Sequence, residues 1–215
     1  MISLLLARLY GIMFKNKISV WLEREGKRSK GQSSFRRHHS TINHLVTLRI
    51  IVEECRNSKS NLLRCFVYFR KAFDTVPRNN LWNILEELQP PFELRVVVIR
   101  LYKTIIAKFK DNKWCSKEIN CDIGVKQGFP LSSTLFGIYF DKLEGFLEEV
   151  GCADTTLASI VIVLLIYVDD IIILARCPFD PYKQLRTLKD FFSNMDMTIN
   201  RDKNKVMIIK SQKVT

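Results

Sequence analysis

Glycine and proline are scarce in this chain of 215 residues, with 8 and 6 residues respectively. That composition excludes a collagen-like or low-complexity chain, and 47% apolar residues are typical of a folded domain. The six cysteines include no C-x-x-C pair, unlike a zinc ribbon or a disulfide scaffold. We therefore expect an intracellular, reducing compartment and a core built from apolar packing.

Signals for secretion and membrane insertion are also lacking. The N-terminal apolar run of about six residues ends at Arg8 and has no basic segment before it, unlike a signal peptide. The apolar segment 157–175 contains Asp169 and Asp170, each of which would cost roughly 2.5–3.5 kcal/mol at a bilayer centre. We expect two buried strands joined by a tight turn there, and no membrane partner.

Acidic residues are outnumbered, with 22 Asp and Glu against 34 Lys and Arg and a net charge of +12. This excess favours a polyanionic partner, either nucleic acid or an acidic membrane face. Part of it lies in the basic stretch 24–37 and part in the tail 201–213. The candidate nucleic-acid-binding residues are Lys27, Arg28, Lys30, Arg36 and Arg37. The alternative is a solvated charged face.

Apolar periodicity and turn residues predict a mixed order of helices and strands. The predicted helices are 4–22, a second one capped by Ser40, 81–89, 92–106, a long one that begins at Ser132 or Ser133 and stops at Gly151, and 181–195. The predicted strands are 62–69, a hairpin with arms 107–110 and 114–123, the two strands around Asp169–Asp170, and 207–210.

The strongest chemical signal is the pair Asp169–Asp170 between two apolar strands. Buried carboxylates need a partner, which neighbouring Ile and Leu side chains do not provide. A divalent cation does, because Mg²⁺ binds one or two carboxylates together with water and substrate phosphates. The alternative is a solvated Asp-Asp turn. Asp74 offers a second acidic position near a strand end, and Gln127 lies in a loop before a helix start, where phosphate could bind.

Four blocks in this order resemble the reverse transcriptase domain of non-LTR (LINE-type) retrotransposons. They are Phe-Val-Tyr-Phe-Arg-Lys-Ala-Phe-Asp at 66–74, Gln-Gly-Phe-Pro-Leu-Ser-Ser-Thr-Leu-Phe at 127–136, Tyr-Val-Asp-Asp at 167–170 and Asn-Arg-Asp-Lys at 200–203. Upstream, Gln-Ser-Ser-Phe-Arg at 32–36 resembles a block of the fingers.

The resemblance implies an α+β right-hand polymerase fold with an antiparallel palm sheet packed on helices. Residues 1–60 would form partial fingers and 61–215 the palm, with the thumb missing. The implied activity is RNA-directed DNA polymerisation, in which a primer 3′-oxygen attacks a deoxynucleotide with the help of two Mg²⁺ ions. The implied partners are an RNA template, a DNA primer and deoxynucleoside triphosphates, with the chain a monomer, and nuclear if it acts as a retroelement enzyme.

The resemblance also assigns residues to roles. Asp169 and Asp170 would be catalytic and would bind metal, and Asp74 is a further candidate ligand. By the same resemblance, Phe73, Gln127 and Lys203 would contact the nucleotide. Core packing is the alternative for Phe73, and a solvated lysine is the alternative for Lys203.

One departure from the family pattern bears on activity. The first block of the family supplies a third carboxylate at the position held here by Tyr68. A neutral phenol in this place leaves two carboxylates facing up to four metal charges, so affinity for the second Mg²⁺ should fall. We expect polymerisation by this copy to be impaired. The alternative is a catalytically inactive polymerase-like fold that binds nucleic acid through its basic surface alone.

Overall fold

The computed structural model describes residues 2–111, 113–149, 156–157, 160–161, 164–176, 181–200 and 202–210. The chain divides into two compact units, each made of two chain segments: 1–27 with 73–138, and 28–72 with 139–215. These boundaries differ from the expected division at residue 60, and the assignment of fingers and palm to 1–60 and 61–215 stays a prediction. No helix in the described part of the chain has the length and apolarity needed to cross a membrane.

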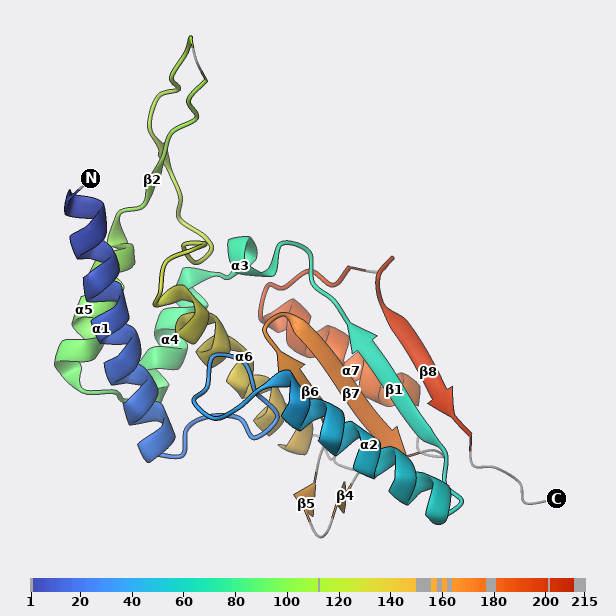
Figure 1. Ribbon diagram of the computed structural model, residues 1–215. Coiled ribbons are helices and arrows are strands. Elements are labelled where there is room, and N and C mark those ends of the chain that lie inside the picture. The colour runs from blue at the N-terminus through green and yellow to red at the C-terminus, as the bar shows by residue number, and fades with distance from the viewer. Residues whose placement is uncertain are drawn as a thin grey trace. The chain divides into compact units, whose positions relative to one another are not determined.

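The first unit is largely helical. It contains α1 (Ile2–Arg24), α4 (Arg78–Leu88) and α5 (Phe92–Lys103), and α5 packs against both α1 and α4 (Figure 1). These helices confirm three of the predicted ones. Their buried side chains are mostly aliphatic and include Ile18, Leu22, Leu81, Leu85 and Val98. Gln89 adopts a left-handed φ of 54° and ends α4 just before Pro90–Pro91, as expected for a helix stop.

Four further elements lie between residues 72 and 149. A single helical turn, α3 (Ala72–Thr75), was not predicted. The strands β2 (Ile106–Ala107) and β3 (Ile119–Asn120) pair antiparallel and form the base of the predicted hairpin. Helix α6 (Ser132–Glu149) begins at Ser132 as predicted, and its predicted stop, Gly151, lies outside the described residues.

A four-stranded antiparallel sheet organises the second unit. Its order is β6 (Leu164–Tyr167), β7 (Asp170–Arg176), β1 (Leu62–Val67) and β8 (Lys205–Ile209), visible in Figure 1. The short strands β4 (Thr156–Leu157) and β5 (Ile160–Val161) pair with each other, where the sequence predicted one longer strand before the turn. The antiparallel sheet packed on helices confirms the predicted fold class.

Successive side chains of β1 point to opposite faces of the sheet, and both faces are covered by helices. Leu63, Cys65, Val67 and Phe69 are buried on one face, where the Phe69 ring meets Phe140 of α6 and Phe192 of α7 (Pro181–Asn194), with ring centroids 5.1 Å and 4.7 Å away. Edge-to-face contacts of this kind add about 0.5–1.5 kcal/mol beyond burial.

Helix α2 (Thr41–Asn57) covers the opposite face. Ile51 and Cys55 of α2 form one buried cluster with Leu62, Leu165 and Leu174 of the sheet. The helix starts after Ser40, whose backbone N–H donates to the Asn43 side chain at 2.8 Å. The predicted cap at Ser40 is therefore confirmed.

The basic stretch is irregular beyond the end of α1, and its middle is buried. Ile166 of the edge strand β6 donates its N–H to the Gly31 carbonyl at 2.7 Å, and Ser33 N–H donates to the Ile166 carbonyl at 3.1 Å. The loop thus satisfies backbone groups that an edge strand would otherwise expose. An ion pair fixes the loop to α6: Arg28 Nε lies 3.3 Å from Asp141 Oδ2, and the two side chains are 4% and 9% exposed.

Breaking this buried pair should destabilise the second unit strongly. Arg28→Met leaves the Asp141 carboxylate buried without its cation, and we expect the free energy of unfolding to fall by about 3–5 kcal/mol. The double substitution Arg28→Met with Asp141→Leu removes both charges and should recover most of that loss. Urea unfolding measures both values, and a double variant as unstable as the single one would contradict the assignment.

Candidate active site

The predicted tight turn holds the acidic pair. Tyr167 of β6 pairs with Asp170 of β7, so Val168 and Asp169 are the two central residues of a hairpin turn. Val168 has a φ of 61°, as the first central position of a type II′ turn requires. A β-branched residue rarely adopts this conformation, and such strain costs of order 1–3 kcal/mol. The surrounding sheet holds the two carboxylates at an apex despite that cost.

Tyr68 lies next to this apex. In the β1–β7 ladder Val67, the last residue of β1, pairs with Ile171, so Tyr68 follows at the end of the ladder where Asp170 begins β7. Both backbone groups of Tyr68 are held: its N–H donates to Asn204 Oδ1 at 2.9 Å, and its carbonyl accepts the Asn200 N–H at 2.8 Å. These hydrogen bonds therefore hold the segment of the fourth sequence block against the first block. At the position where the family pattern has a third carboxylate, this chain has the phenol of Tyr68.

The carboxylates of Asp169 and Asp170 repel each other at the apex. Partial burial raises the pKa of the Asp170 carboxyl above its usual value, the adjacent Asp169 carboxylate raises it further, and Lys203 opposes both effects. Lys203 therefore lies within electrostatic range of Asp170, and its contact with the nucleotide stays a prediction. A bound cation would relieve the same repulsion between the two acids.

The donor set at the apex fits one magnesium ion better than two. Mg²⁺ commonly binds one or two carboxylates and completes its octahedron with water and phosphate oxygens, so Asp169 and Asp170 suffice for one ion. Among the described residues, no group of three or more His, Cys, Asp and Glu side chains is arranged to hold a metal. The missing third carboxylate is the one that Tyr68 replaces.

The other predicted nucleotide residues meet in the first unit. Gly124 N–H donates to the Val76 carbonyl and Val125 N–H donates to the Phe73 carbonyl, both at 2.8 Å, so the Gln127 loop is joined to the segment after the first block. This brings Gln127 Nε2 within 2.8 Å of Asp74 Oδ1, to which it donates. Asp74 was a candidate metal ligand; the structure gives its carboxylate an amide partner, and metal binding by Asp74 stays a prediction.

Phe73 is half-buried and stacks on Phe136 of α6. The ring centroids are 4.2 Å apart and the planes differ by 7°. One face of the ring thus packs against the first turns of α6, in agreement with the core-packing alternative. Because Phe73 is only half-buried, the stacking contact does not exclude the predicted contact with the nucleotide, which stays a prediction.

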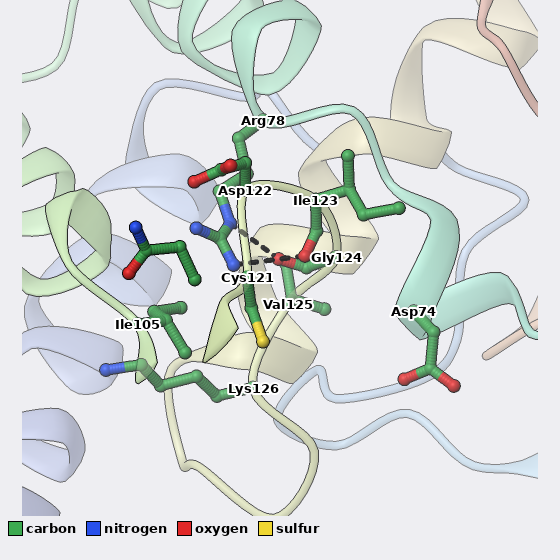
Figure 2. A pocket seen from close by; sticks show the side chains of 10 residues that line it. Asp74, Arg78, Ile105, Cys121, Asp122, Ile123, Gly124, Val125 and Lys126 are labelled. Atoms are coloured by element: carbon green, nitrogen blue, oxygen red, sulfur yellow. Dashed lines mark hydrogen bonds between the residues drawn. The ribbon is translucent and has the colours of Figure 1, made fainter. Parts of the chain in front are cut away.

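A cavity of about 420 Å³ borders Asp74 (Figure 2). Arg78 reaches from α4 to its wall and donates to the Gly124 and Ile123 carbonyls at 2.8 Å and 3.0 Å, and to the Tyr102 carbonyl at 3.2 Å. The guanidinium therefore fixes the backbone that leads to Gln127. Sequence reasoning missed Arg78, because carbonyl acceptors in a distant loop leave no side-chain pattern in the sequence.

The predicted nucleic-acid-binding residues differ in their surroundings. Lys30 and Arg37 are exposed, in agreement with a surface role. Arg28 is buried against Asp141, so the prediction that it contacts phosphate is wrong: a guanidinium enclosed with a carboxylate is not on the surface. Arg36 donates to the Ser29 and Gln32 carbonyls at 2.7 Å and 3.1 Å, and Lys27 donates to the Leu88 carbonyl at 2.9 Å. Through these hydrogen bonds, Arg36 and Lys27 stabilise the fold.

His44 is a second residue that sequence reasoning left without a role. Its Nε2 lies 2.9 Å from the Ile166 carbonyl, and its Nδ1 lies 3.4 Å from Ser33 Oγ. Burial lowers the pKa of His44, and the hydrogen bond with Ile166 opposes this shift. The neutral ring thus connects α2 and the loop to the residue directly before Tyr167.

An antiparallel sheet with two acids at a hairpin apex, flanked by helices, defines a palm of the polymerase class. The family model for reverse transcriptase (RNA-dependent DNA polymerase) matches residues 9–215, and the chain belongs to this family. Members of the family generally use divalent metal ions.

Two relatives with curated descriptions come from retrotransposons. The chain is 27% identical over 165 residues to a retrovirus-related Pol polyprotein of the type-2 retrotransposable element R2DM of Drosophila melanogaster, covering 73% of this chain and 15% of that protein. It is also 27% identical over 139 residues to the Pol polyprotein of a type-1 retrotransposable element R2 of Nasonia vitripennis, covering 60% and 12%. The chain therefore spans a small part of these relatives.

Solved structures confirm the right-hand polymerase fold. The telomerase of Candida tropicalis in complex with a telomeric RNA fragment matches with a TM-score of 0.65 at 14% identity, covering 94% of this chain and 34% of that one. The telomerase of Candida albicans matches with the same TM-score and identity, covering 92% and 35%.

The loop that carries Gln127 provides a test of this geometry. Gly124 has a φ of 79°, and a Cβ there would lie 2.6 Å from the Asp74 carbonyl oxygen; Gly128 has a φ of 74° and no atom within 4 Å of its Cβ position. Gly128→Ala should cost roughly 1–3 kcal/mol of unfolding free energy through backbone strain alone. Gly124→Ala should cost more, because the Asp74 backbone must also move. Equal costs in urea unfolding would show that the two segments are not joined as described.

Proposed function

We propose that this chain is the catalytic palm of an RNA-directed DNA polymerase that transfers deoxynucleotides to a primer 3′-hydroxyl on an RNA template. The observation that carries the proposal is the pair Asp169–Asp170 at a strained hairpin apex, in a chain of the reverse transcriptase family. The two adjacent carboxylates repel each other, and a bound divalent cation would relieve that repulsion.

Each residue of the apex has a defined part in this proposal. Asp169 and Asp170 bind Mg²⁺, which when bound stabilises negative charge on the reacting phosphate. Lys203, near Asp170, supplies a further positive charge for a triphosphate. In the first unit, Gln127 and Phe73 contact the incoming nucleotide, and Asp74 orients the Gln127 amide by accepting its hydrogen bond.

Tyr68 limits the activity of this copy. A second Mg²⁺ would meet a neutral phenol in place of a carboxylate, so its affinity should be low and transfer slow. The alternative, a fold that binds nucleic acid through basic surface without catalysis, rests on this same substitution. A nuclear site of action follows from the proposal if the chain serves a retroelement.

Primer extension on an RNA template with Mg²⁺ tests the proposal. We expect weak extension by the native chain, none by Asp169→Asn, and at least about tenfold faster extension by Tyr68→Asp, because the restored carboxylate gives the second ion a ligand. Asp190→Asn, which removes an exposed acid of α7, is the matched control and should behave as the native chain.

Two outcomes would contradict the proposal. Extension by Asp169→Asn at the native rate would show that the apex is not the reacting centre. Failure of the native chain and of Tyr68→Asp to extend any primer, with retained binding of the primer-template, would support the inactive alternative.

A further inference from the structure

The hairpin between α5 and the Gln127 loop has no role in the site described above, yet it exposes two large aromatic rings. Phe109 is 67% exposed and Trp114 is 63% exposed. Figure 1 shows this hairpin extending beyond the ends of β2 and β3 in the first unit. Exposed aromatic side chains on a two-stranded arm are costly to keep in water unless something covers them.

Backbone pairing places both rings on one face. Ser116 N–H donates to the Phe109 carbonyl at 2.8 Å, while Asp111 N–H donates to the Trp114 carbonyl at 2.9 Å. Residues 109 and 116 are thus opposite each other, and so are 111 and 114. Since alternate residues of a strand share a face, Phe109 and Trp114 are diagonal neighbours across the hairpin.

The charge of the hairpin as a whole is positive, although Asp111, which is opposite Trp114, shares the face of the rings. The residues between β2 and β3 include Lys108, Lys110, Lys113 and Lys117 against the acids Asp111 and Glu118. Lys108 forms an exposed ion pair with Glu118 at 2.9 Å, which leaves the excess with the other three lysines. A second copy of the chain, also at net +12, would be repelled, whereas a polyanion would be attracted.

We infer that this hairpin is a binding site for single-stranded nucleic acid, with bases stacked on Phe109 and Trp114 and phosphates near Lys113 in the turn. Aromatic rings beside lysines are the combination that binds unpaired strands, because every unpaired base offers a face for stacking. A duplex offers no such face along its length, since its bases are already stacked on one another. The inference extends the proposed function, because it gives the polymerase a contact with unpaired template. It rests on the proposed function only where it identifies the bound strand as the template.

Equilibrium binding of a labelled oligouridylate of about 12 nucleotides to the full chain tests the inference by fluorescence anisotropy. We expect Phe109→Ala and Trp114→Ala each to raise the dissociation constant at least about fivefold, the loss of one stacked base. Trp114→Phe should bind nearly as the native chain does, because it keeps a ring. Phe92→Ala removes an aromatic side chain that is 66% exposed elsewhere in the unit, and should leave binding unchanged.

Trp114 fluorescence gives a second readout, which is recorded on the native chain without any substitution in the hairpin. Titration with the oligonucleotide should quench the emission of the native chain, and this component should be missing in Trp114→Phe. A duplex of the same length should quench it far less. Salt should weaken binding of the native chain, and Lys113→Gln should reduce that dependence relative to Lys189→Gln, a matched change on α7.

The inference is overturned if Phe109→Ala and Trp114→Ala bind the strand as Phe92→Ala does, or if the chain self-associates in sedimentation through Trp114 and does not bind the strand there. Its failure is separable from failure of the proposed function. Loss of hairpin-dependent binding with retained Asp169-dependent primer extension removes only the hairpin site, whereas the reverse result removes only the polymerase proposal.

Discussion

The antiparallel pairing of β1 with β7 is the constraint on which the active-site geometry depends. Through the register of Val67 with Ile171 it brings the start of the first block beside the acidic apex, although the two segments are about a hundred residues apart in sequence. A slip of one residue would turn every side chain of β1 to the opposite face and move Val67 and Phe69 from their buried positions to the half-buried ones of Phe66 and Tyr68. Burial of the phenylalanine cluster under the sheet therefore also fixes which residue meets the two acids.

Neighbouring segments hold this arrangement from both sides. Asn200 and Asn204 bind the backbone of Tyr68, and the loop of residues 31–33, with His44, binds the backbone of Ile166 one residue before the apex. The strained φ of Val168 is tolerated because these contacts and the β6–β7 pairing leave the turn no relaxed alternative. The apex is thus preorganised by backbone hydrogen bonds, while its chemistry depends on side chains alone. Replacing one side chain, as at Tyr68, alters metal binding without requiring a change of fold.

Much of the fold could be predicted from the sequence. Apolar periodicity located the main helices, and the run interrupted by Asp169–Asp170 indicated the hairpin, because local pattern and turn chemistry agree there. The order of the blocks predicted the family. What could not be predicted depends on contacts distant in sequence: the burial of Arg28 with Asp141, the carbonyls held by Arg78, and the hydrogen bond from Gln127 to Asp74. A basic residue in a charged stretch looks the same in sequence whether it faces water or a buried acid.

The central claim is that Asp169 and Asp170 form a divalent metal site beside Tyr68. Paramagnetic Mn²⁺, added in small amounts to the ¹⁵N-labelled chain, tests it most directly, because it broadens the amide signals closest to the bound ion. The account predicts early broadening of residues 167–171 together with Tyr68 and Lys203, and its loss in Asp169→Asn. Broadening confined to residues 73–76 and 122–127, with the apex signals unchanged, would contradict it.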